Sequence, residues 1–277
     1  MSTLLVGYVI ILPFYGPYTC HREFTIIISM KFKLLLIQLA VTLVAIFFYS
    51  KGVTHQPQTY HLFADGKPFL GIPNAMNVLT NVLFIIVGLL GLKVINLKRH
   101  ELLNRKSWFW FFLSISLIGP GSAYYHWSPD DFTLIWDRLP MSMGFMAMYV
   151  ALVSEHINLK LEKFLSVSLI LGVGSVFIWA ITGDLRFYFI VQFSSFVTIP
   201  LILVLFHSRF TLKRYYVFAL AFYALAKWTE VKDGEIYEAT NHLISGHSLK
   251  HILAAAGLFV LCRMVKCREL ITSKTSP

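Results

Sequence analysis

Residues 77–106 read NVLTNVLFIIVGLLGLKVINLKRHELLNRK, an apolar run that ends in a cluster of basic residues. An apolar stretch of about 18 or more residues is long enough to cross the hydrocarbon layer of a membrane as a helix. Lysine and arginine gathered beside such a span are typical of its cytoplasmic end. The stretch therefore predicts a membrane-spanning helix at about 77–95 whose carboxyl end faces the cytoplasm.

Comparable apolar runs occur along most of the chain. Of its 277 residues, 57% are hydrophobic and only 14% are charged. A soluble core of this size could not bury so much apolar surface, so we predict an all-α membrane protein. Its eight spans are expected at 33–49, 77–95, 108–126, 133–154, 164–182, 187–207, 215–232 and 247–266.

The first residues differ from the rest. Residues 1–32 contain no clean span and are interpreted as an N-terminal tail. Met30 is followed by two lysines and an apolar run, a pattern typical of a true amino terminus with a signal anchor. We therefore interpret residues 33–49 as an extra transmembrane anchor that stays attached, and Met30 as an alternative start.

Charges alternate between the two ends of the predicted spans. Basic clusters follow the second and sixth spans and the last one, whereas 128–131 and Asp184 are acidic connections. The net charge of +10 therefore indicates membrane topology and argues against a nucleic-acid-binding protein. This alternation places the C-terminus in the cytoplasm and the start of the last span at the extracytoplasmic face.

Histidines mark the extracytoplasmic ends of two spans. His247 and His251 begin the last span within SGHSLKHILAA (245–255) and are four residues apart. One helical face can thus offer two imidazoles to one metal ion. His126 ends the third span at the same depth, and a third imidazole would leave one position for water, as in catalytic zinc sites. Alternatively, these histidines simply lie at the membrane interface.

Two further polar residues lie at this depth. Ser122 is four residues before His126, hence on the same helical face, and Asp137 begins the fourth span. Ionisable residues within a membrane are costly and are functional candidates by default. The structural alternatives are that Ser122 is a small packing residue and that Asp137 is an acid favoured by the helix dipole or paired with Arg138.

A fourth polar group lies in the seventh span. Lys227 and Glu230 are three residues apart and could pair within one helix, which is the role we favour. The alternative is that they orient a metal ligand from outside. His242 is off the face of His247 and is a fallback ligand only.

The combination of a serine four residues before a histidine, a nearby aspartate and a late HxxxH resembles the alkaline ceramidase family. That family is part of a seven-helix group of membrane hydrolases that includes the adiponectin receptors. GIPNAMNVLTNVLF (71–84) also resembles the family's first core helix. The resemblance covers about residues 60–270. It therefore implies a seven-transmembrane-helix bundle, preceded by the extra anchor at 33–49.

Site roles follow by position in that resemblance. It implies that His126, His247 and His251 bind Zn2+, that Asp137 holds or deprotonates a zinc-bound water, and that Ser122 hydrogen-bonds within the site. It further implies a zinc-dependent hydrolase that cleaves the amide bond of ceramide or a similar N-acylated lipid in sphingolipid metabolism. The membrane lipid itself would be the substrate.

Calcium regulation is not implied. The family's eukaryotic ceramidases carry an acidic calcium site before the first core helix. This chain has only Asp65 there, with Asn74 where a glutamate is expected.

Two other functions stay open. A receptor or sensor with the same fold would keep the metal as a structural element. A transporter or metal permease would line a path across the bilayer with ionisable residues, whereas the candidates here gather at one depth.

Overall fold

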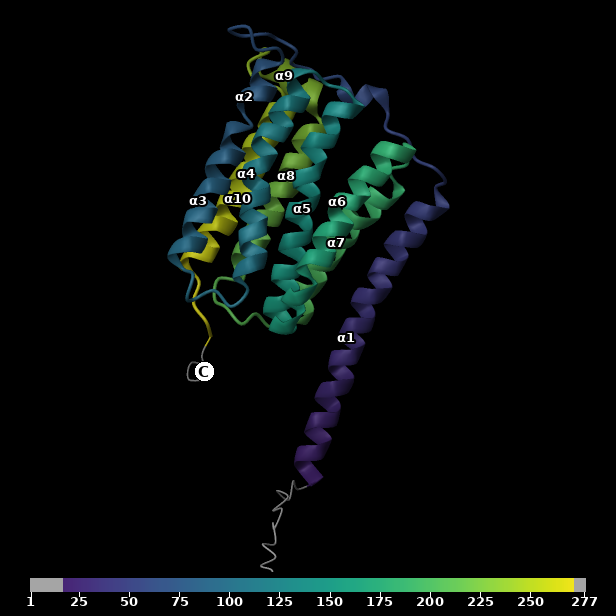
Figure 1. Ribbon diagram of the computed structural model, residues 1–277, viewed down its shortest axis with the longest axis vertical. Coiled ribbons are helices and arrows are strands. Elements are labelled where there is room, and N and C mark those ends of the chain that lie inside the picture. Colours follow the sequence, from purple (N-terminus) through teal and green to yellow (C-terminus); the bar gives the residue numbers. More distant parts are fainter. Residues whose placement is uncertain (1–16, 272–277) are drawn as a thin grey trace, which may run out of the picture. The chain divides into compact units, whose positions relative to one another are not determined.

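The computed structural model describes the backbone of residues 17–271 and the side chains of residues 29–271. Over these residues the chain is almost entirely helical, as predicted (Figure 1). The α-helices are α1 (Pro17–Ser50), α2 (Ala75–Leu79), α3 (Val82–Leu97), α4 (Arg105–Trp127), α5 (Asp131–His156), α6 (Leu165–Thr182), α7 (Arg186–Leu205), α8 (Arg214–Val231), α9 (Asp233–Ala239) and α10 (Gly246–Cys267), and short 3-10 helices lie at Gln58–His61 and Leu159–Phe164.

Several of these helices suit a membrane. Within the described residues, five segments are long and apolar enough to cross one: Ser29–Ser50, Ala75–Leu97, Leu159–Thr182, Arg186–Leu205 and Gly246–Cys267. The protein is therefore a multi-pass helical membrane protein. The other ranges predicted as spans fall within α4, α5 and α8. Polar residues reduce the apolarity of α5 and α8, for example Asp137 in α5 and Glu230 in α8.

The chain divides into two compact units, residues 1–39 and residues 40–277, and the boundary between them falls within α1. Part of the predicted tail lies outside the described residues, but α1 already begins at Pro17, well before the expected anchor. Within the second unit, the ring of Phe48 lies 5.4 Å from that of Phe189 and 5.1 Å from that of Phe193. The carboxyl end of α1 therefore packs on α7.

The remaining helices form the bundle of the second unit. α4 packs against α3 and α5, α5 packs against α6 and α7, and α10 packs against α3 and α8 (Figure 1). At one end, the backbone N–H of Leu185 donates to Thr54 O at 2.8 Å, and that of Ala64 donates to Asp233 at 2.9 Å. The connections at 51–74, 183–185 and 232–245 therefore meet at this end, which we call the site end.

The opposite end, here called the basic end, is closed by a buried ion pair. Nη2 of Arg268 lies 2.7 Å from Oε1 of Glu155, and the two side chains are only 2% and 0% exposed. Trp108 Nε1 and Tyr216 OH also donate to the Glu155 carboxylate, at 2.7 and 3.1 Å. A buried charge is tolerated when it is paired and hydrogen-bonded. These contacts join α4, α5, α8 and the segment that follows α10.

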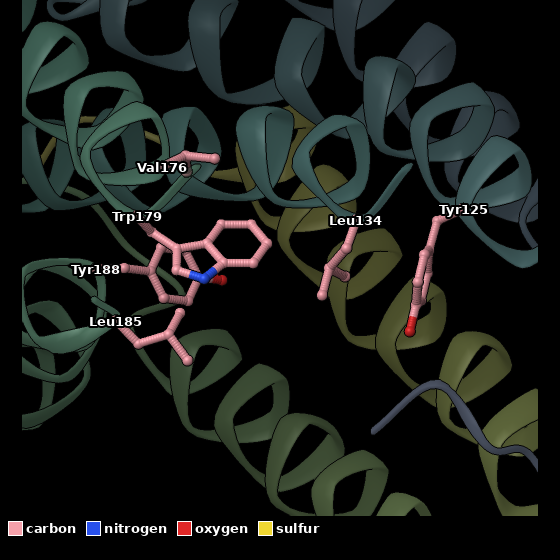
Figure 2. Close-up of a cluster of buried hydrophobic side chains, with 6 residues drawn as sticks. All are labelled: Tyr125, Leu134, Val176, Trp179, Leu185 and Tyr188. Atoms are coloured by element: carbon pink, nitrogen blue, oxygen red, sulfur yellow. The ribbon is translucent and has the colours of Figure 1, made fainter. Parts of the chain in front are cut away.

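An apolar cluster at the site end holds the start of α5 in place. Its buried side chains come from α4, α5, α6, α7 and the residue before α7; they are Tyr125, Leu134, Val176, Trp179, Leu185 and Tyr188 (Figure 2). The helix itself begins with a capping box, in which Asp130 accepts from Thr133 N at 2.7 Å and Thr133 Oγ1 accepts from Asp130 N at 3.1 Å. This start positions Asp137 in the second turn of α5.

Helices α3 and α4 approach closely at a glycine. A Cβ atom added to Gly88 would lie 2.3 Å from the backbone nitrogen of Ser116. Small residues at such crossings are how membrane helices come together. The α3–α4 contact matters for the site because α4 carries His126.

Gly88→Ala is therefore expected to destabilise the protein by about 1–3 kcal/mol, because the α4 backbone would have to move. Gly174→Ala in α6 is the matched control, since no atom lies within 4 Å of its added Cβ. Thermal unfolding of both purified variants in the same detergent measures the difference. Equal melting temperatures would contradict the close α3–α4 packing.

Candidate metal centre

Three buried histidines meet at the site end. His126 lies in the last turn of α4, and His247 and His251 lie in the first two turns of α10. Their exposed fractions are 1%, 5% and 3%, and one ring nitrogen from each lies within 4.8 Å of the others. The structure thus brings together the three histidines singled out by their spacing and their common depth.

The spacing of the rings suits shared coordination of one ion. Nε2 of His126 lies 3.3 Å from Nε2 of His247. Two nitrogens bound to one tetrahedral zinc at about 2.0–2.1 Å lie about 3.3–3.4 Å apart. Nδ1 of His126 is buried and has no hydrogen-bond partner among the described residues. Three imidazole donors in this arrangement fit a divalent transition-metal ion.

Thr80 holds His251 in the tautomer that can bind a metal through Nε2. The Thr80 hydroxyl has one hydrogen, which it donates to Met76 O at 2.7 Å. Its contact of 2.9 Å with Nδ1 of His251 must then be one in which Thr80 accepts. Nδ1 therefore carries the hydrogen and Nε2 keeps its lone pair. Metal-binding histidines are commonly oriented in this way by a hydrogen bond at the other ring nitrogen.

Two side chains, from two of the connecting segments, hold the histidine-bearing backbone. Asp233 accepts from the backbone N–H of His247 at 2.7 Å and from that of Ala64 at 2.9 Å. Asn74 donates through Nδ2 to the carbonyl oxygen of His126 at 2.8 Å. The start of α10, the end of α4 and the long 51–74 loop are therefore tied to one another.

Asp65, the acidic residue before α2, is engaged inside the protein. It is 3% exposed. Its Oδ1 accepts from the backbone N–H of Lys67 at 3.1 Å and from Tyr237 OH at 3.2 Å. In this structure its carboxylate thus links the 51–74 loop to α9.

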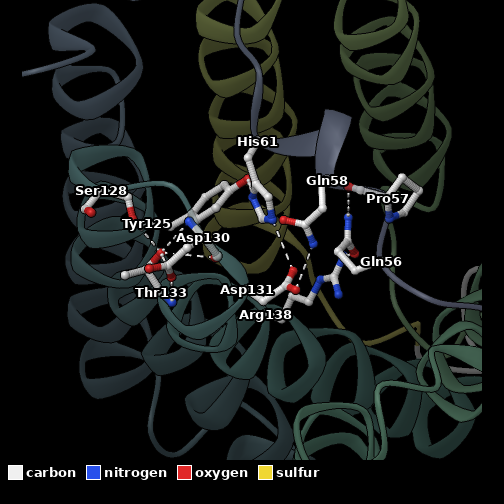
Figure 3. Close-up of polar contacts among 10 residues, drawn as sticks. All are labelled: Gln56, Pro57, Gln58, His61, Tyr125, Ser128, Asp130, Asp131, Thr133 and Arg138. Carbon is white, nitrogen blue, oxygen red and sulfur yellow. Dashed lines mark hydrogen bonds and ion pairs between the residues drawn. The ribbon is translucent and has the colours of Figure 1, made fainter.

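Ser122 and Asp137 lie together. Ser122 is one turn before His126, and its hydroxyl lies beside the Asp137 side chain across the α4–α5 contact. Arg138 is bound elsewhere: its Nη2 donates to Gln56 Oε1 at 2.6 Å (Figure 3), and its guanidinium lies 4.3 Å from the centre of the Trp179 ring. Among the described residues, Asp137 therefore has Ser122 beside it and forms no salt bridge with Arg138.

The 51–74 loop covers the histidines. Nε2 of His61 lies 3.1 Å from Asp131 Oδ1, and its Nδ1 lies 3.0 Å from Tyr125 OH (Figure 3). The Phe63 ring stands edge-on to the rings of His126 and His247, with centroids 4.7 and 4.5 Å away. Apolar cover of this kind excludes water from the cluster and strengthens electrostatic interactions within it.

Tyr60 from the same loop reaches the charged groups of the bundle. The Tyr60 side chain is 39% exposed, but desolvation around its hydroxyl raises its pKa to about 12, and this hydroxyl lies within electrostatic range of Glu230, Arg138, Asp137 and Lys227. The phenol therefore stays protonated at neutral pH and remains a hydrogen-bond donor beside these charges.

The pair predicted within α8 is present but has a third member. Lys227 pairs with Glu230, and Glu230 Oε1 also accepts from Lys250 Nζ of α10 at 3.0 Å. Lys250 in turn lies 2.9 Å from Nε2 of His247. Sequence reasoning missed Lys250, although its position within HSLKH was a usable signal. It also missed Thr80, because a single hydroxyl residue in an apolar run does not indicate a contact with a histidine.

His242, the fallback ligand, is not in the cluster. Its Nε2 lies 3.0 Å from Glu238 Oε1, and both side chains are largely exposed. The HxxxH pair and His126 are therefore the histidines that the fold brings together.

Comparison with protein-family models finds one match, to the model described as Ceramidase, over residues 71–277. The match covers well over half of the chain and includes Ser122, His126, Asp137, His247 and His251. It leaves out α1 and most of the 51–74 loop. A search among curated proteins finds no match.

Proposed function

The chain belongs to the Ceramidase family, and from this premise we propose a zinc-dependent hydrolase that cleaves the amide bond of ceramide or a similar N-acylated lipid. The family implies an amidase-type hydrolase. The observation that carries the proposal is the buried cluster of His126, His247 and His251, with one ring nitrogen of each within 4.8 Å of the others. Three imidazoles leave a tetrahedral ion with one open position, the arrangement typical of catalytic zinc.

The residues around the cluster suit amide hydrolysis. Bound zinc would activate a water molecule and polarise the amide carbonyl. Asp137 accepts the proton of the attacking water on a carboxylate oxygen. It returns that proton to the amide nitrogen as the C–N bond breaks, so that a fatty acid and an amine are released. In this proposal the Ser122 hydroxyl, which lies beside Asp137, donates a hydrogen bond that orients the carboxylate for both transfers.

The same proposal includes the arrangement in the membrane. We assign the seven-helix domain to residues 60–270 and the extra anchor to residues 33–49. Basic residues gather at the end of the bundle opposite the histidines, among them Lys98, Arg99 and Lys213. A basic end normally faces the cytoplasm. The metal centre would then open toward the extracytoplasmic face, where a lipid amide lies near the membrane surface.

Purified protein supplied with zinc is expected to release fatty acid from at least one member of a panel of N-acylated lipids. The panel should contain ceramides of several acyl lengths, N-acyl ethanolamines and N-acyl amino acids, with products measured by mass spectrometry. His126→Ala, prepared in parallel, corrects for contaminating amidases. If the wild type released no more fatty acid than this variant from any lipid, the proposal would be wrong.

A further inference from the structure

Lys250 contacts the histidine cluster from an unusual side. Its Nζ lies 2.9 Å from Nε2 of His247, the nitrogen that itself faces Nε2 of His126 at 3.3 Å. Thr80, by contrast, contacts Nδ1 of His251. A group that only supports a metal-binding histidine bonds to the ring nitrogen that is not used for the metal. Lys250 therefore reaches the side of the cluster where reacting groups would lie.

Glu230 holds the Lys250 ammonium in this place. Its Oε1 accepts from Lys250 Nζ at 3.0 Å, across the contact between α8 and α10. The side chains of Glu230 and Lys250 are 15% and 19% exposed, whereas that of Lys227, the second partner of Glu230, is 53% exposed. A largely buried ammonium needs such a partner. Lys250 is thus fixed, while Lys227 remains at the surface of the bundle.

The charge of Lys250 acts on several groups of the site. The ammonium is within electrostatic range of His126, His247 and His251, and of Asp137 as well. Lysine offers three N–H donors: Glu230 takes one, and the one that faces Nε2 of His247 here is freed when the single lone pair of that nitrogen binds the metal. A donor therefore remains for a substrate placed between the histidines and Asp137.

We propose that the Lys250 ammonium binds the amide oxygen of the substrate and stabilises the negative charge that develops on it. This inference rests on the proposed function and adds a catalytic residue to it, with Glu230 as a positioning residue. When water attacks the carbonyl carbon, the C=O π electrons move onto the oxygen, and Lys250 donates a hydrogen bond without giving up its proton. The C=O bond re-forms as the amine leaves with the proton carried by Asp137.

A hydrogen-bond donor fixed in a water-poor site acts mainly on the transition state. Lys250→Met is therefore expected to lower kcat about 10²–10³-fold with little change in KM. Lys250→Gln, which keeps a neutral donor, should recover part of this loss and serves as the second variant. Glu230→Gln should lower kcat about 10–100-fold, because the ammonium remains but is held less firmly. Lys227→Met, the matched control, should stay close to wild type because Lys227 is exposed.

Zinc affinity gives a second readout that needs no turnover. An ammonium beside a ligand nitrogen repels a divalent cation, so Lys250→Met should bind zinc several-fold more tightly in competition with a chelator. If Lys250 had only a structural role, Lys250→Met would instead lower zinc affinity and melting temperature together. If the wild type is active and both Lys250 variants keep its kcat, the inference is wrong. The proposed function would be unaffected by that result.

The two failures can be told apart. If the wild type hydrolyses none of the lipids, the proposed function fails, and the zinc measurement still decides on Lys250. Unchanged or weaker zinc affinity in Lys250→Met and Lys250→Gln would show that the ammonium does not lie beside the ligand atoms, which overturns the inference.

Discussion

Replacing Asp137 by asparagine is expected to lower kcat about 10²–10⁴-fold while the protein keeps its metal. Asp137 is not one of the three imidazole donors, so the substitution leaves the histidine cluster intact. Asparagine has nearly the same shape, and its amide oxygen can still accept the hydrogen bond from Ser122. An amide, however, does not take a proton from water at neutral pH. Fatty-acid release and metal content should be measured on the same sample.

Ser122→Ala is the companion variant. It keeps the Asp137 carboxylate but removes the hydroxyl that orients it, so its loss of kcat should be smaller than that of Asp137→Asn. The two variants also distinguish a hydrolase from a receptor or sensor with a structural metal. A hydrolase would lose turnover in both variants, whereas a sensor has no turnover that could be lost. Wild-type kcat in Asp137→Asn would remove Asp137 from the proposed proton transfers.

His247→Ala is expected to lose nearly all bound metal and all measurable hydrolysis. Its Nε2 lies 3.3 Å from that of His126, so the substitution removes one of the three donors of the ligand set. Two imidazoles remain, and they come from different helices. Metal content of the purified variant, measured by elemental analysis, tests this expectation directly.

His242→Ala is the matched control for the metal measurement. His242 lies five residues away on the same segment, pairs with Glu238 and does not belong to the cluster. It should retain metal and activity. A chelator should reduce wild-type activity to the level of His247→Ala, and added zinc should restore only the wild type. Equal metal content in the two variants would contradict a site built on His247.

Much of the helical framework could be predicted because its signals are local. Apolar runs of sufficient length and the alternation of loop charges located α3 to α8 and α10 within a few residues, whereas the short helix α9 was not predicted. The HxxxH spacing identified two members of the cluster, since residues four apart share a helical face. Depth in the membrane then selected His126 from the remaining histidines.

The rest of the site depends on contacts between distant segments. Thr80, which lies between α2 and α3, meets His251 only because these two helices pack against α10, and Glu230 meets Lys250 only because α8 does. No local spacing reveals such pairs. For the same reason, the pairing of Lys227 and Glu230 was predicted within one helix, but its connection to the histidines was not.

The ion pair at the basic end has a practical consequence for dividing this protein. Glu155 lies at the end of α5, whereas its positively charged partner, Arg268, follows α10 near the end of the described chain. A fragment that stops inside α10 would strand a carboxylate in a low-dielectric interior, at a cost of about 3–5 kcal/mol. The smallest self-sufficient piece must therefore extend through Arg268. Split or circularly permuted versions can be cut in loops elsewhere but must keep that arginine in place.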